Sequence, residues 1–473
     1  PFAAGGADGM RGAELAVKQR GGVVAGRKIE IIKASSDAKP DVAVNATRKQ
    51  VEQDKVDIMV GPLSGGEGIA VKDYSKTQPQ VTFINGGSGA QATTLVNTSS
   101  NFFRFNTEGA QWMVGLGKAA MDKGYKRTMI IAEDYAFPYS QVQGFMAEYC
   151  RLGGKVPVKA WVPLGGKDYS SVIATIPKDV DALLVILGGA DAVNFLTQYE
   201  NSGGDKPMMG GSITVSQDVL NYKGKRRDSL VGTISAGPLA DSFDGADWKA
   251  FVADYQRNYP VSAGGYPSPS LFAFVYYVNM KAALDGLAAV NGDLSGGQAK
   301  YRDALQKMVL KTPTGDVRLD SNRQAIGTTF VTEVVKDSRG NLSTKVSRKV
   351  DNVDQTLGIC IIHISEIHDY WRVIAIVLTN HSRIVIAMWM ERDDAIENWL
   401  LFVHRNHRLY RTKSWCGLRE NWCALGARTK ESAATALYRR SDRGNGRTCR
   451  CRRCVYRITL GGKRIVTSII NKT

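Results

Sequence analysis

Two matching strand ends are the parts of this chain best suited to chemistry. The apolar run QVTFIN ends at Gly86-Gly87-Ser88, and the run PMM ends at Gly210-Gly211-Ser212, 124 residues later. Glycine lets a backbone approach a small molecule closely. N–H groups at the start of a following helix attract an anionic group, typically by about 0.3–1 kcal/mol. The two triplets therefore predict a binding site for a small molecule.

A second pair of segments repeats at the same spacing. VDIMVGPLSGGE (56–67) aligns with VDALLVILGGAD (180–191), and the step from Val56 to Val180 is again 124 residues. One such pair could arise between any two strand–helix units, whereas two pairs with the same offset favour a duplicated lobe. Ligands of open parallel sheets bind beyond the carboxyl ends of the strands. Two facing lobes would therefore form a cleft with glycine-rich turns on both sides.

Catalytic chemistry is not expected. The first 359 residues contain no His and one Cys, Cys150, whose neighbours Tyr149 and Leu152 indicate a packed helix. A nucleophile and a base are therefore not available together. GGADAVNF does not match the dinucleotide fingerprint G-x-G-x-x-G, and GGSGAQ lacks the lysine of a phosphate loop. We predict a binding protein that is not an enzyme and that has no cofactor and no metal site.

Alternating strands and helices must hold these turns in place. Short β-branched runs alternate with amphipathic stretches, which is typical of parallel α/β sheets. The predicted strands cover 28–37, 56–62, 80–86, 127–134, 155–164, 180–187 and 207–212. The predicted helices cover about 10–20, 41–53, 67–78, 110–123, 138–152, 190–202, 246–258, 269–290 and 297–310. Crossings near 103–108, 234–240 and 312–330 would make a hinge that closes on a ligand.

The pattern predicts an α/β fold of two Rossmann-like lobes with parallel sheets, joined by a three-strand hinge. We expect the first lobe to comprise 1–105 and 238–325, and the second to comprise 106–237 and 326–358. The chain is long enough for several domains, and its 43% hydrophobic content is that of a globular protein. The most apolar window, 373–390, is interrupted by Asn380, His381 and Arg383, so no membrane span is predicted.

The last 114 residues have a different composition. Of the formal net charge of +17, residues 360–473 contribute +12, from 21 Lys and Arg against 9 Asp and Glu. This segment also contains all five His, six of the seven Cys and none of the 14 Pro. We interpret 360–473 as an aberrant, out-of-frame segment that is not a native fold. The basic charge is therefore not read as a nucleic-acid signal.

Two functional readings of this tail remain as alternatives. Cys449, Cys451 and Cys454, with His404 and His407, could supply zinc ligands, although their spacing is not that of a zinc finger. The basic stretch 439–457 could bind nucleic acid. Neither reading draws support from the first 359 residues.

The first 358 residues resemble a known family. GMRGAELAVKQRGG, MVGPLSGGEG, VTFINGGSGA, EDYAFPYSQ, VILGGADAV and SPSLFAFVYYVNMKAAL occur in the order and spacing of that family. It comprises the periplasmic solute-binding proteins of ABC transporters of the leucine/isoleucine/valine type, with the type I periplasmic-binding-protein fold. The resemblance implies a receptor in the periplasm or another extracytoplasmic space. It also implies membrane permease components as partners.

The resemblance assigns roles to individual residues. Ser64, Gly65 and Gly66 match a turn that holds the ligand carboxylate through hydroxyl and backbone donors. Gly87, Ser88 and Gly89 match a turn that offers a carbonyl and a hydroxyl to the ligand. Tyr139 matches an aromatic residue of the second lobe that closes over the ligand. The expected ligand is a small amino acid or a related carboxylate.

Two positions depart from the family pattern. Ala190 stands where amino-acid binders often carry an aromatic residue, and Ser212 stands where they often carry the glutamate that pairs with the ligand's ammonium group. A buried ammonium needs a carboxylate partner. The candidates are Glu67, Asp134 and Asp191, each of which could equally be a helix-start carboxylate.

Without such an acid, the ligand could be an aromatic acid or a neutral amide. Phe272 and Phe274 could line an apolar pocket or belong to the core. An alternative function is a ligand-sensing bilobal domain of a regulator or receptor for amides or aromatic acids. The family's first strand precedes the residue that matches Pro1, so we also expect the central strand of the first lobe to be missing, and that lobe to be destabilised.

Overall fold

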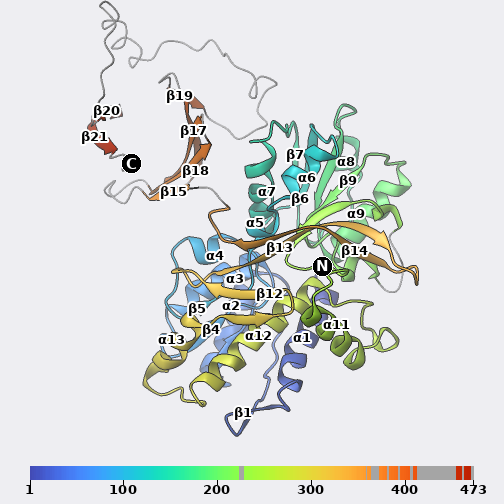
Figure 1. The fold of residues 1–473 in the computed structure, drawn as a ribbon, viewed down its shortest axis with the longest axis vertical. Helices are drawn as coiled ribbons and strands as arrows, with labels where there is room; N and C mark the ends of the chain where they lie inside the picture. Colours follow the sequence, from blue (N-terminus) through green and yellow to red (C-terminus); the bar gives the residue numbers. More distant parts are fainter. Residues whose placement is uncertain are drawn as a thin grey trace, which may run out of the picture. The chain divides into compact units, whose positions relative to one another are not determined.

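The computed structural model describes residues 1–222 and 228–357 in full. Beyond them it describes the backbone of 360–363, 372–380, 383–392, 395–404, 409–412, 454–460 and 463–469. The described chain divides into two units, Pro1–Cys423 and Ala424–Thr473 (Figure 1). Within the described residues, no helix has both the length and the apolar character required to cross a membrane.

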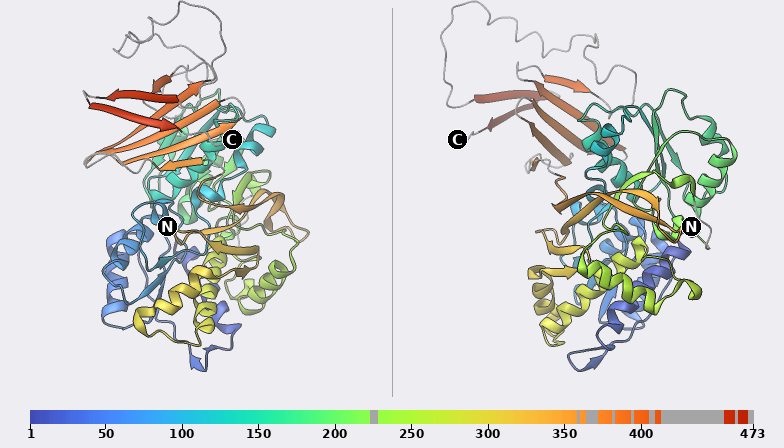
Figure 2. Two further views of the ribbon diagram at one scale, coloured as in Figure 1. Left: turned by 60° about the vertical axis from the view of Figure 1, so that its left-hand side comes forward. Right: turned by 45° about the vertical axis from the view of Figure 1, so that its right-hand side comes forward.

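The first sheet is small and parallel. Its strands are β3 (Ile58–Val60), β4 (Thr82–Ile84) and β5 (Phe102–Phe103), in that spatial order. The helices that alternate with these strands along the chain are α2 (Pro40–Glu52), α3 (Gly65–Ser75) and α4 (Ala92–Leu95). Helix α1 (Ala3–Lys18) packs along α12 (Leu271–Ala289), which also contacts β3 and β4. The turned views of Figure 2 show the yellow later helices beside the blue first part of the chain.

The second sheet is larger, with nine strands. Its parallel part has the order β10-β9-β8-β6-β7, and β8 and β6 are buried at every residue. Such buried runs are typical of central parallel strands covered on both faces. The parallel strands are β6 (Thr128–Glu133), β7 (Lys159–Val162), β8 (Ala182–Ile186), β9 (Met208–Gly210) and β10 (Ile234–Gly237). The associated helices are α5 (Gly109–Trp112), α6 (Leu116–Asp122), α7 (Ala136–Tyr149), α8 (Ser170–Ala174), α9 (Gly189–Asn201) and α10 (Gln217–Leu220).

The later part of the chain completes both regions. Strand β13 (Ala325–Lys336) pairs antiparallel with β10, with β12 (Gly315–Leu319) and with β14 (Leu342–Val353). Strand β11 (Leu310–Thr312) extends this edge, and α11 (Ala246–Asn258) and α13 (Ala299–Lys307) return to the neighbourhood of α1 and α12. The long strand β13 therefore links the small strands near the first sheet to the second sheet.

Most of the predicted elements are confirmed, but the strand predicted over 28–37 is wrong. The structure has a short hairpin there, β1 (Val23–Val24) with β2 (Arg27–Lys28), followed by residues outside any strand. A strand needs a neighbour for its hydrogen bonds, and no described strand lies alongside this segment. The carbonyl of Ile32 accepts a hydrogen bond from Gln50 Nε2 instead, at 2.7 Å.

The helix predicted over 110–123 is interrupted. Gly115 has φ = 92°, a left-handed conformation that ends α5 and starts α6. Glycine adopts this conformation without the steric cost of a side chain. The sequence pattern predicted one continuous helix here and missed the break.

The tail contributes strands that pair only with one another. In the first unit, β15 (Cys360–His363), β16 (Arg372–Asn380), β17 (Arg383–Arg392), β18 (Ala395–His404) and β19 (Leu409–Thr412) form an antiparallel sheet. In the second unit, β20 (Cys454–Leu460) pairs with β21 (Lys463–Ile469). The interpretation of 360–473 as an out-of-frame segment stays a prediction.

A buried arginine ties the first crossing to the turn after β4. Arg104 is fully buried and donates to the carbonyls of Ala90 at 2.7 Å and Ser88 at 3.4 Å. It also donates to Gln324 Oε1 and Thr94 Oγ1. Burial lowers the pKa of Arg104 to about 10. The guanidinium therefore fixes the turn after β4 against the third crossing segment, which contains Gln324.

We expect Arg104→Met to lower the free energy of unfolding by about 3 kcal/mol, because it leaves buried carbonyl and amide acceptors without donors. Urea denaturation followed by tryptophan fluorescence would measure the loss. The exposed Arg318, whose guanidinium donates to Asn352, provides the control. Arg318→Met should change the stability by no more than about 0.5 kcal/mol. Equal effects of the two substitutions would contradict the assigned role.

Candidate ligand-binding cleft

The turn between β3 and α3 forms one wall of the candidate site. Ser64 is the N-cap of α3 and forms a capping box with Glu67. Its N–H donates to Glu67 Oε2 at 2.8 Å, and its Oγ accepts from the Glu67 N–H at 3.4 Å. The following Gly65 and Gly66 supply the first N–H groups of the helix, which have no carbonyl partner within the helix. This end of α3 can therefore hold an anionic group.

The turn after β4 lies directly beside the first. The N–H groups of Gly87 and Ser88 donate to the carbonyl of Pro62, at 2.9 and 3.3 Å. Ser88 is fully buried and its hydroxyl has no hydrogen-bond partner, while its carbonyl accepts from Asn85 Nδ2 at 3.0 Å. Gly87 and Gly89 face the cleft, whereas Ser88 points into the protein toward Gly68.

The start of α7 packs against these glycines from the side of the second sheet. A Cβ added at Gly65 would lie 2.8 Å from the N and Cβ of Phe137, and one at Gly89 would lie 2.7 Å from its ring. The Gly109 N–H donates to the Gly89 carbonyl at 2.8 Å. The Gln91 N–H donates to Ser140 Oγ at 2.9 Å. Any larger side chain at position 65 or 89 would hold the two sides apart.

These contacts line a hollow that is partly open to solvent, which we call the cleft cavity. Its walls combine the glycine turns with four aromatic rings and contain no Lys, Arg, His, Asp or Glu side chain. Its lining residues are Leu63, Ser64, Gly65, Gly87, Gly89, Trp112, Tyr135, Phe137, Ile213, Leu271 and Phe272. Phe272 therefore faces the cavity, whereas Phe274 packs in the core against Trp248 and Phe251.

The remaining residues predicted for the second lobe lie around this cavity but not in its wall. Ser212 is buried and accepts a hydrogen bond from Gln141 Nε2 at 2.8 Å. The N–H of Ala190 donates to the carbonyl of Pro1 at 3.2 Å. Asp191 is buried and accepts from the Gly165 N–H at 2.6 Å, and burial raises its pKa. Their contacts with a ligand stay predictions.

Two predicted residues are exposed. The Tyr139 hydroxyl donates to the Asp134 carboxylate, and the Tyr139 ring meets the edge of Trp161 at 4.7 Å between centroids. Neither Tyr139 nor Asp134 lines the cleft cavity. The aromatic residues of this segment that do line it are Tyr135 and Phe137. Phe137 is therefore an alternative to Tyr139 as the aromatic residue that closes over the ligand.

Glu133 is a candidate that sequence reasoning missed. One of its carboxylate oxygens accepts from the Gly188 N–H at 3.0 Å, and the other is buried without a partner. Burial raises the pKa of Glu133 to about 8. Burial and the nearby Glu133 charge also raise the pKa of Tyr135, whose side chain lines the cavity. The sequence feature that could have identified Glu133 was its position as the last residue of a strand that ends at the cleft.

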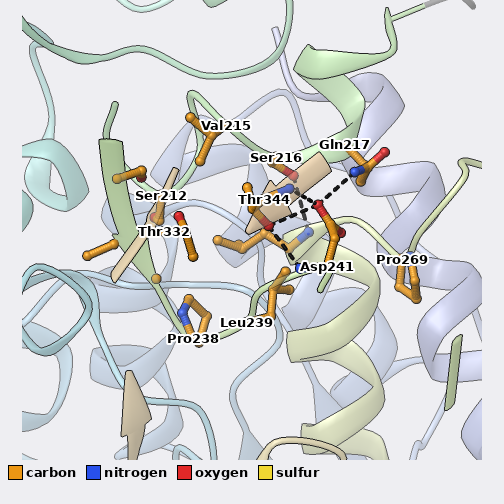
Figure 3. Close-up of a pocket in the computed structure, with 14 residues that line it drawn as sticks. Ser212, Val215, Ser216, Gln217, Pro238, Leu239, Asp241, Pro269, Thr332 and Thr344 are labelled. Atoms are coloured by element: carbon orange, nitrogen blue, oxygen red, sulfur yellow. Dashed lines mark hydrogen bonds between the residues drawn. The ribbon is translucent and has the colours of Figure 1, made fainter. Parts of the chain in front are cut away.

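A second cavity, which we call the crossing cavity, adjoins the first. It measures about 330 Å³ and shares Leu271 with the cleft cavity (Figure 3). Its walls come from the segments after β9 and β10, from β13 and β14, and from the start of α12. Seven polar side chains line it: Ser212, Ser216, Gln217, Ser235, Asp241, Thr332 and Thr344. Ser212 thus faces a cavity, but a different one from that lined by Ser64.

Residues 1–222 and 228–357 contain no group of three or more His, Cys, Asp or Glu placed to hold a metal ion. The zinc candidates Cys449, Cys451, Cys454, His404 and His407 lie outside the residues whose side chains the structure describes, as does the basic stretch 439–457.

We expect Glu133→Gln to change the pH dependence of stability. The folded pKa of about 8 lies above the unfolded value, so the native state binds the extra proton and loses stability as pH rises toward 8. The stability of the glutamine variant relative to wild type should therefore rise by roughly 2 kcal/mol between pH 6 and pH 9. Chemical denaturation at both pH values measures this change. Asp134→Asn, at the exposed neighbour, should show no such rise, and a flat difference for Glu133→Gln would refute the assignment.

Known proteins are similar to this chain in sequence and in fold. A relative from Brucella melitensis biotype 1, named Leu/Ile/Val-binding protein homolog 6, is 23% identical over 359 residues, which cover 73% of this chain and 87% of the relative. An ABC transporter substrate-binding protein from Sphaerobacter thermophilus superposes with a TM-score of 0.66 at 24% identity, covering 75% of this chain and 95% of that chain. A solute-binding protein of an ABC transporter from R. palustris, solved with benzoate, superposes with a TM-score of 0.67 at 21% identity, covering 75% and 94%.

The family model for periplasmic binding proteins matches residues 1–340, which is most of the chain. The matched residues contain the first sheet, every strand of the second sheet except β14, the glycine turns and the start of α7. The α/β architecture is that of the type I fold expected from the sequence. The chain belongs to the periplasmic binding protein family.

Proposed function

We propose that this protein is the extracytoplasmic solute receptor of an ABC importer, and that it captures a small carboxylate in the cleft cavity. The observation that carries the proposal is the packing of Phe137 against Gly65 and Gly89, which encloses a cavity between the two sheet regions. A molecule in this cavity would contact both regions at once. Binding would therefore favour the closed arrangement over an open one.

The cavity wall suits an anionic group joined to an apolar body. The first N–H groups of α3 and the hydroxyl of Ser64 offer donors to a carboxylate. Trp112, Tyr135, Phe137 and Phe272 offer flat apolar surfaces to the rest of the molecule. Because no cationic side chain lines the cavity, the donors for an anion would be mainly backbone groups and hydroxyls.

Two ligand classes fit this wall, and related proteins illustrate both. An aromatic acid would place its ring among the four aromatic residues, and the R. palustris neighbour holds benzoate. A branched amino acid would place its apolar side chain against the same rings, and the Brucella relative is named as a Leu/Ile/Val-binding protein homolog. The closed form would then be recognised by the membrane components of the importer, which places the receptor outside the cytoplasm.

The test is a thermal-shift screen of the full chain, followed by calorimetry of the compounds that stabilise it. Benzoate, 4-hydroxybenzoate, L-leucine, L-phenylalanine and benzamide cover the proposed classes. At least one carboxylate should raise the melting temperature, because a ligand that binds only the native state stabilises it by mass action. Stabilisation by benzamide alone, or by none of these compounds, would argue against a carboxylate receptor.

Two variants locate the binding contacts. Phe137→Ala should weaken binding of the stabilising compound by roughly tenfold or more, because it removes the ring that spans both sides of the cavity. Tyr139→Ala is the matched control, since this ring is exposed and does not line the cavity. The opposite ranking would assign closure to Tyr139 and would move the binding site away from the cleft cavity.

A further inference from the structure

The crossing cavity has the chemistry of a second binding site. It is bounded by the ends of β9 and β10, by β13 and β14 and by the start of α12, so it lies where the chain passes between the two sheets. In contrast to the cleft cavity, its wall contains a carboxylate.

Only one of the two oxygens of this carboxylate accepts hydrogen bonds. Asp241 Oδ2 accepts three hydrogen bonds, from the Thr344 N–H at 2.7 Å, from Gln217 Nε2 at 2.9 Å and from Thr344 Oγ1 at 2.9 Å. Figure 3 shows this carboxylate held between Gln217 and Thr344. Asp241 Oδ1 is buried and has no hydrogen-bond partner among the described atoms. Burial raises the pKa of Asp241, whereas the buried Ser268 hydroxyl beside it acts in the opposite direction and favours the charged carboxylate.

No positive charge balances Asp241. The other residues that line the cavity are Ser, Thr, Gln, Gly, Ala, Val, Leu and Pro, and none of them is a cation. Ion pairs formed elsewhere in the described chain do not include Asp241. A buried carboxylate with a free oxygen and no cation partner is costly. A ligand that brings a positive charge and N–H donors would remove that cost.

We propose that the crossing cavity is a binding site for an ammonium group, with Asp241 as its anionic partner. Asp241 Oδ1 accepts one N–H bond, and the hydroxyls of Ser212, Ser235 and Thr332 in the same wall offer further acceptors. The ammonium group has two possible sources: a separate small organic cation, or the amino end of a solute bound in the adjoining cleft cavity. The site itself does not depend on the transport function proposed above.

Methylammonium is the direct probe of the site. It should raise the melting temperature of the full-length wild-type protein by about 2 °C or more at saturation. Tetramethylammonium at the same ionic strength should not, because it has no N–H donor. Asp241→Asn should abolish the methylammonium effect, whereas Asp244→Asn, at an exposed acid that pairs with Lys249, should preserve it.

Because Asp241 also holds Thr344, its substitution can disturb the fold, so the test needs a second variant that leaves Asp241 unchanged. Leu239→Trp narrows the cavity from a partly buried position and leaves the hydrogen bonds of Asp241 in place. It should also abolish the methylammonium effect. Equal stabilisation of wild type and both variants, or no stabilisation of wild type by methylammonium, would overturn the proposal.

The source of the ammonium follows from a matched pair of solutes. L-Leucine and 4-methylpentanoate differ only in the amino group. If Asp241→Asn weakens L-leucine binding by tenfold or more and leaves 4-methylpentanoate unchanged, the site reads the amino end of the solute. If Asp241→Asn changes the binding of neither solute, and methylammonium stabilises the wild-type protein, the site takes a separate cation. If the wild-type protein binds none of the solutes, the transport proposal is rejected, whereas the result with methylammonium is unaffected.

Discussion

Close packing of one aromatic residue against two glycines governs the geometry of the cleft. Phe137 lies so near to positions 65 and 89 that even a methyl group there would overlap it. The glycines follow strands of the first sheet, and Phe137 follows a strand of the second. The first-sheet side therefore has to supply glycines where the second-sheet side supplies a large ring. The cavity exists because a large flat residue meets two positions that have no side chain.

Several buried charged groups of the described chain fall into two classes. Arg104 and Glu67 are buried but well supplied with partners: Arg104 has carbonyl and amide acceptors, and Glu67 caps α3. Glu133, Asp218 and Asp241 each keep at least one buried oxygen without a partner. The first class has a structural role that its own contacts explain. The second class lies around the cleft and the crossing, where a bound molecule could complete the missing contacts.

The sequence predicted the architecture better than the site. Apolar periodicity located the parallel strands β3, β4 and β6 to β9 and the longer helices, since burial imposes a period of two or 3.6 on each element. It failed at 28–37, because forming a strand depends on a neighbouring strand and not on the segment alone. It also failed at Gly115, where one left-handed residue breaks a continuous apolar pattern.

Within the site, the difficulty was choosing between neighbouring residues. Glu133 is the last residue of β6 and is buried, whereas Asp134 is exposed one position later. Phe137 faces the glycines, whereas Tyr139 faces solvent two positions later. Such choices depend on where a strand ends and how a helix turns, to within one residue. Composition and spacing do not distinguish such neighbouring residues, although they did place Ser64, Gly65, Gly87 and Gly89 after the ends of their strands.

The start of α12 connects the two cavities mechanically. The side chain of Leu271 lines both, and its N–H donates to Ser216 Oγ, which itself lines the crossing cavity, at 3.1 Å. Phe272, the next residue, lines the cleft cavity and lies against Gly5 of α1. A ligand that shifts Leu271 from one side must change the space on the other. Occupancy of the two cavities is therefore expected to be coupled, with the first turn of α12 as the shared wall.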